Sequence, residues 1–186
     1  RSFLTDKLSM ERFAEQPDAR GSAERPYIAV WFGPTPYLLR TEAAPIVPPV
    51  LAELAREAVL IDVVTGKELE PPFEAVLPPE DTSPAEQGHC ADREALQRST
   101  RIIAGARGFL SAHGGLSYLG PLQGVPTVTV YSDPANYRPV PVGWTAVNFG
   151  LSTFMVERLT GSVPMALDAA RVSETELLEA VRGRMS

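Results

Sequence analysis

The sequence has few cysteine and histidine residues. Its 186 residues include one cysteine, Cys90, and two histidines, His89 and His113. A single cysteine excludes a disulfide within the chain and a cysteine-rich metal site, and it agrees with a reduced, cytoplasmic setting. His89 and Cys90 are adjacent but have no further histidine near them, so we predict no metal site.

The chain also lacks a dense block of positive charge and a long apolar run. Its 17 Lys and Arg are outnumbered by 23 Asp and Glu, which gives a net charge of -6. Such a chain is a poor candidate for binding nucleic acid or an anionic membrane. The apolar runs are too short for a transmembrane segment, and the N-terminus does not resemble a signal peptide. A bound phosphate would have to be held by backbone dipoles and a few cations.

Residues 1–25 are polar and mixed, which predicts an N-terminal segment or linker with a short helix around residues 8–14. Residues 26–186 are predicted to form one domain. Apolar runs predict strands over residues 27–32, 60–64, 73–77, 108–112, 127–131 and 163–167. Apolar spacing, prolines and capping residues predict helices over residues 49–58, 92–106, 116–123 and 144–159, and from Ser173 to near the C-terminus.

The near-regular alternation of strands and helices predicts the fold class. It indicates an α/β fold with a doubly wound, mostly parallel, Rossmann-like sheet that carries helices on both faces. Ligands of such sheets bind at the carboxyl ends of the strands. Three strand ends therefore hold the candidate site: Gly33 to Thr35, His113 to Ser117, and Ser132 with Asp133.

The His113-Gly114-Gly115 stretch is the most informative of these ends. Two glycines permit a tight turn and the close approach of a ligand, and the helix expected after them would direct unpaired N–H groups to the same place. Ser117 could add a hydroxyl donor. The alternative is a turn that only packs, with His113 hydrogen-bonded to backbone. The chain has neither a G-x-G-x-x-G sequence nor a Walker lysine motif.

The surrounding sequence resembles a known family. The residues that carry the resemblance are Ala104-x-Ala106-x-Gly108-Phe109-Leu110, Ala112-His113-Gly114-Gly115-Leu116-Ser117, Pro121-Leu122-x-Gly124-Val125-Pro126 and Tyr131-Ser132-Asp133. Over these thirty or so residues the chain resembles the nucleotide-sugar-binding C-terminal half of GT-B fold glycosyltransferases. Beyond them only the order of elements is similar.

The resemblance implies a ligand and a set of roles. The diphosphate of a nucleotide-sugar donor would lie on the backbone N–H groups of Gly114, Gly115 and Leu116, with Ser117 nearby. His113 would face the diphosphate or the sugar and is the catalytic candidate. The resemblance further implies that four residues at the other two strand ends contact the ligand, namely Ser132, Asp133, Gly33 and Thr35. It also implies a reaction that needs no metal.

The chain departs from the family in one important respect. GT-B enzymes have an acceptor-binding half that supplies the catalytic base, and residues 1–25 cannot form one. We therefore expect a donor-binding fragment or a subunit that needs a partner. Two alternatives stay open, a nucleotide-sugar epimerase and a non-catalytic nucleotide-binding or interaction module.

Arg40 is a more distant candidate for contact with phosphate.

Overall fold

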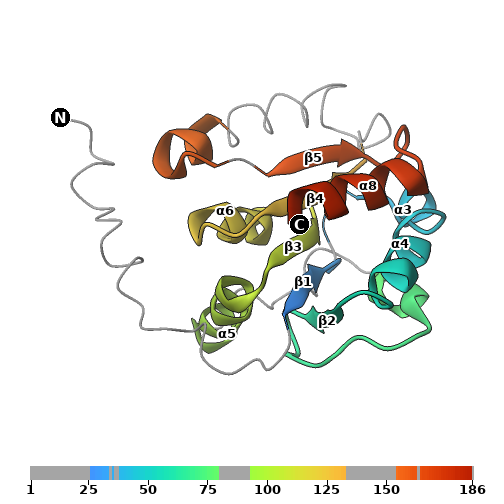
Figure 1. The fold of residues 1–186 in the computed structure, drawn as a ribbon, viewed down its shortest axis with the longest axis horizontal. Helices are drawn as coiled ribbons and strands as arrows, with labels where there is room; N and C mark the ends of the chain where they lie inside the picture. The colour runs from blue at the N-terminus through green and yellow to red at the C-terminus, as the bar shows by residue number, and fades with distance from the viewer. Residues whose placement is uncertain are drawn as a thin grey trace.

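The computed structural model describes residues 26–33, 35, 38–79, 93–132, 154–162 and 164–185 (Figure 1). Five strands form one sheet in the order β2-β1-β3-β4-β5, and every neighbouring pair is parallel. The strands are β1 (Tyr27–Trp31), β2 (Val59–Asp62), β3 (Gly108–Ala112), β4 (Thr127–Tyr131) and β5 (Met165–Asp168). The α/β prediction is therefore confirmed.

Helices cover both faces of the sheet (Figure 1). They are α3 (Arg40–Ala43), α4 (Val47–Leu54), α5 (Arg93–Gly105), α6 (Leu119–Leu122) and α8 (Glu174–Met185), with 3-10 turns η1 (Phe73–Val76) and η4 (Gly115–Tyr118). Residues 154–160 are also helical. No helix in the described part of the chain is both long and apolar enough to cross a bilayer.

The strands are apolar on both sides, and each side packs into its own core. Ile28, Val30 and Leu110 pack with α4 and α8 in the larger core. Ala29 and Phe109, which alternate with them along the strands, pack with Ile103 of α5 and Leu116 of η4 in the smaller core. This is the pattern expected of a parallel sheet buried on both faces, and it confirms the doubly wound, Rossmann-like arrangement.

The predicted strand over residues 73–77 is wrong. Phe73–Val76 forms the 3-10 turn η1. Pro71 and Pro72 precede it and Pro78 and Pro79 follow it; prolines cannot donate to a strand ladder. The guanidinium of Arg40 instead donates hydrogen bonds to the carbonyls of Leu77 and Pro78, the latter at 2.8 Å, and so fixes the turn against α3.

Other helices and strands begin or end a few residues from their predicted boundaries. Helix α4 begins at Val47 and ends at Leu54, with proline in its first turn as predicted. The capping box of α8 is confirmed, because the Ser173 N–H donates to the Glu176 carboxylate at 2.8 Å and the Glu176 N–H donates to the Ser173 hydroxyl at 3.2 Å. The predictions for residues 1–25, for Asp92 and for residues 144–153 lie outside the described residues.

Candidate functional site

The strand order places the carboxyl ends of β1 and β3 side by side. From β1 the chain passes through α4 to β2 on one side, and from β2 it returns through α5 to β3 on the other. The direction of winding therefore reverses between β1 and β3, which is the position where open α/β sheets form a ligand crevice. The predicted site segments 33–35 and 113–117 follow these two strands directly.

The two segments contact each other. The Thr35 hydroxyl donates a 2.9 Å hydrogen bond to the backbone carbonyl of His113. The half-buried indole of Trp31 lies against both loops, since an added Cβ would come within 2.5 Å of it at Gly33 and within 3.5 Å of it at Gly114. Trp31 and Thr35 thus join the end of β1 to the end of β3.

The glycines of the site do not supply a left-handed turn. Gly114 is extended, with φ of 168°, and the glycines with positive φ in the described residues are Gly66, Gly124 and Gly161. Gly115 is exposed, and a Cβ added there would meet nothing within 4 Å. The chain does turn here, into η4, but neither glycine has the positive φ that would require glycine. The close approach of a ligand at Gly115 stays a prediction.

The turn after β3 leaves two backbone donors unused. The Ser117 hydroxyl, fully buried, donates to the Gly114 carbonyl at 2.7 Å and accepts a 3.4 Å hydrogen bond from the Gly114 N–H. Within the described part of the chain, the N–H groups of Gly115 and Leu116 donate no hydrogen bond. The predicted helix 116–123 is split into η4 and α6, each of four residues, so these individual N–H groups rather than a long helix dipole would attract an anion.

His113 is buried and held by a neighbouring side chain. Only 4% of its surface is exposed, and its Nε2 lies 3.0 Å from the Tyr118 hydroxyl. Burial lowers the pKa of His113 to about 3 from its ordinary 6.5, so the imidazole is neutral near pH 7. In this state it can offer or accept a hydrogen bond, but it brings no positive charge to a diphosphate.

Of the other predicted site residues, Ser132 and Arg40 lie within the described residues and Asp133 does not. The buried hydroxyl of Ser132, at the end of β4, accepts a 3.0 Å hydrogen bond from the Leu39 N–H. This contact and the Thr35 bond show that the segment after β1 reaches the ends of both β3 and β4. Asp133 lies outside the described residues. Arg40 donates its hydrogen bonds to the carbonyls of Leu77 and Pro78, which follow η1.

Several residues of this site could not be recognised from the sequence. Tyr118 follows His113 by five residues and belongs to no motif, and Trp31 is the last residue of the apolar strand β1. Ser111 and Thr129 are in register on β3 and β4, are fully buried, and have hydroxyls with no hydrogen-bond partner among the described residues. Ser111 lies two residues before His113 on the same side of β3, so the sheet surface next to His113 is polar.

Comparisons with protein-family models, with curated proteins and with solved structures found no match for this chain. Within the described residues, no three His, Cys, Asp or Glu side chains gather as they would around a metal ion. The geometry at the carboxyl ends of β1 and β3 is therefore the basis for inferring a function.

Proposed function

We propose that this chain is the donor-binding α/β unit of a glycosyltransferase and that it binds a nucleoside diphosphate sugar at the carboxyl ends of β1 and β3. The observation that carries the proposal is the position of the His113–Ser117 turn. It stands at the point where the winding of the sheet reverses, joined to the β1 loop by the Thr35–His113 hydrogen bond. The resemblance of residues 104–133 to the GT-B donor half specifies the ligand.

The diphosphate would lie against the two unused N–H groups of Gly115 and Leu116. Gly115 is exposed and has open space around it, so a phosphate oxygen could reach the backbone there. When the bond between the sugar and the diphosphate breaks, negative charge develops on the leaving group. N–H groups already aimed at that position stabilise the transition state more than the ground state.

The chemistry of the crevice favours binding over proton transfer. In segments 31–35 and 111–118 the titratable side chains are those of His113 and Tyr118, and these hydrogen-bond to each other. A neutral His113 could orient the diphosphate or the sugar by a hydrogen bond. The base that activates the acceptor would come from a second, acceptor-binding half or from a partner subunit. An epimerase would need proton-transferring groups within this crevice, which makes it the weaker alternative.

Calorimetric titration with nucleoside diphosphates and inorganic diphosphate tests the proposal. At least one nucleoside diphosphate should bind, and it should raise the melting temperature in proportion to its occupancy. Gly115→Val should abolish this binding, because the new side chain would fill the space next to the two N–H groups. Gly183→Ala is the matched control, since that glycine also has open space around it but lies on α8.

The possible outcomes separate the alternatives. Binding that Gly115→Val abolishes, without sugar turnover by the isolated chain, supports the donor-binding unit. Isomerisation of a nucleotide-sugar in the absence of acceptor, seen by NMR of the sugar protons, would favour an epimerase. No response to any nucleoside diphosphate would favour an interaction module and contradict the proposal.

A further inference from the structure

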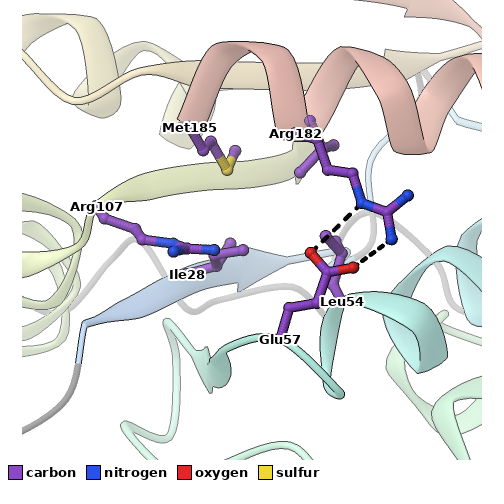
Figure 2. Close-up of a pocket in the computed structure, with 7 residues that line it drawn as sticks. Ile28, Leu54, Glu57, Arg107, Arg182 and Met185 are labelled. Carbon is purple, nitrogen blue, oxygen red and sulfur yellow. Dashed lines mark hydrogen bonds and ion pairs between the residues drawn. The ribbon is translucent and has the colours of Figure 1, made fainter.

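A cavity lies at the opposite end of the sheet from the crevice. It has a volume of about 230 Å³ and is formed between β1, the residue before β3, and the last turns of α4 and α8. Its lining residues are Ile28, Leu54, Glu57, Arg107, Val181, Arg182 and Met185 (Figure 2). Ile28 stands near the start of β1 and Trp31 at its end, so the two sites are separated along the strand by about 10 Å.

The floor of this cavity is apolar. Ile28 and Leu54 are each 1% exposed, Val181 is fully buried and Met185 is 6% exposed. The Met185 side chain lies directly over Gly108, where an added Cβ would come within 2.3 Å of its Cγ and Sδ. Methionine adapts its shape readily, so this wall can adjust to an inserted group. A cavity with such a floor favours a ligand that has an apolar portion.

The rim of the cavity is charged, with two arginines and one glutamate among the lining residues. Arg182 donates two hydrogen bonds to the Glu57 carboxylate, one of them from Nε to Oε2 at 3.4 Å. Arg107 is exposed and makes no ion pair or side-chain hydrogen bond with the described residues. Figure 2 shows its side chain extending along Ile28 toward the Glu57–Arg182 pair. The hydrogen bond from Arg182 and, less strongly, the charge of Arg107 lower the pKa of Glu57, and Glu53 and Glu179 also act on Arg182 from outside the lining. Arg107 is therefore the arginine of the rim that forms no ion pair with the described residues.

We propose that this cavity binds a small amphipathic carboxylate, whose charged end pairs with Arg107 and whose apolar chain lies on Ile28, Leu54, Val181 and Met185. A planar guanidinium matches a carboxylate through two parallel hydrogen bonds. The volume corresponds to about eight water molecules at about 30 Å³ each, which suits a linear acid of about six carbons. This inference does not depend on the proposed function, because the crevice shares none of the lining residues.

Titration of the whole chain with hexanoate, followed by two-dimensional amide NMR, tests this site. Hexanoate should shift the amide signals of residues that line the cavity and leave Gly115 and Leu116 unshifted. Hexylammonium, which has the same chain and the opposite charge, and acetate, which lacks the chain, should bind at least about tenfold more weakly. Equal binding of hexylammonium, or shifts scattered over the surface, would overturn the proposal.

Two variants test the roles of the head group and the floor. Arg107→Gln should weaken hexanoate binding by about tenfold, since a charge-assisted pair is lost. Arg101→Gln, which removes an exposed arginine of α5 that does not line the cavity, is the matched control. Val181→Ile adds a methyl group to the floor and should block the chain while leaving the fold intact. Unchanged affinity in both Arg107→Gln and Val181→Ile would overturn the proposal.

Discussion

The Thr35 hydroxyl donates a 2.9 Å hydrogen bond to the His113 carbonyl across 78 residues of sequence. This bond connects the loop after β1 to the end of β3, at the point where the winding of the sheet reverses. It therefore sets the position of the turn that contains Gly114 and Gly115.

Thr35→Val should lower the free energy of unfolding by about 1 kcal/mol, because it removes the hydroxyl and leaves the His113 carbonyl without this donor. If the crevice binds a nucleoside diphosphate, the loosened turn should also weaken that binding. Thr35→Ser keeps the hydroxyl and should retain both stability and affinity. Urea denaturation gives the first quantity and calorimetry the second. A Thr35→Val variant as stable as the wild type would show that the bond does not hold the loop.

His113 should make stability depend on pH in a defined window. In the unfolded chain it takes up a proton below its ordinary pKa of 6.5, whereas in the folded chain burial holds that pKa at about 3. The contribution of the buried, neutral His113 to the free energy of unfolding is therefore fully present above pH 6.5. It is lost as the pH falls from 6.5 toward 3, because the unfolded chain then binds a proton that the folded chain does not. The stability of the wild type relative to His113→Leu should fall by at most about 1.4 kcal/mol per pH unit in this window.

Proton NMR provides an independent check on His113. In a His89→Ala background, the remaining imidazole signal should not titrate between pH 8 and pH 5. A midpoint near 6.5 would mean that His113 is accessible and charged near neutral pH. His113 would then carry a positive charge to the diphosphate, and its proposed role as a neutral hydrogen-bonding group would be wrong.

Much of the fold follows from local patterns, whereas much of the site does not. The apolar runs at 27–32, 108–112 and 127–131 predicted β1, β3 and β4 because buried parallel strands read as continuous apolar sequence. The run at 73–77 is also mostly apolar, with Glu74 as its one charged residue, yet the prolines on both sides of it disfavour a strand and it forms η1. The apolar pattern alone does not distinguish these cases, whereas the flanking prolines do.

The site depends on contacts between distant residues. The Gly-Gly pair indicated where the turn is, but the pairing of Thr35 with His113 and of Leu39 with Ser132 arises from strand order. Strand order is a tertiary property that alternation alone leaves open. The resemblance implied that His113 faces the diphosphate or the sugar, and this stays a prediction. The sequence did not indicate that burial beside Tyr118 keeps the imidazole neutral.

Gly33→Ala should displace the indole of Trp31. An added Cβ would lie 2.5 Å from the indole Nε1, closer than unbonded atoms can approach, so the ring must move or the loop must shift. We expect a loss of about 1–3 kcal/mol and a red shift of the tryptophan emission as the ring becomes more exposed. The measurement uses a Trp144→Phe background, in which Trp31 is the sole tryptophan, and an excitation wavelength that tyrosine does not absorb. Gly115→Ala, which adds the same methyl group to open space, should leave emission and stability unchanged.

Gly108 and Met185 should be energetically coupled. A Cβ at Gly108 would lie 2.3 Å from the Met185 Cγ and Sδ, so Gly108→Ala must expel the methionine from its buried position and should cost about 1–3 kcal/mol. Met185→Ala alone should cost about 2–5 kcal/mol, through lost burial and the space left behind.

In the double variant Gly108→Ala/Met185→Ala, the new methyl group at position 108 has room. The double variant should therefore lose less free energy of unfolding than the sum of the losses in the two single variants. A coupling of about 0.5–3 kcal/mol in a double-mutant cycle is expected for residues in such contact. Gly183→Ala, also in the last turns of α8 but with open space around it, should be additive with Gly108→Ala and serves as the control. Additive losses for Gly108→Ala and Met185→Ala would instead show that Met185 does not pack on Gly108, which would remove one wall of the cavity.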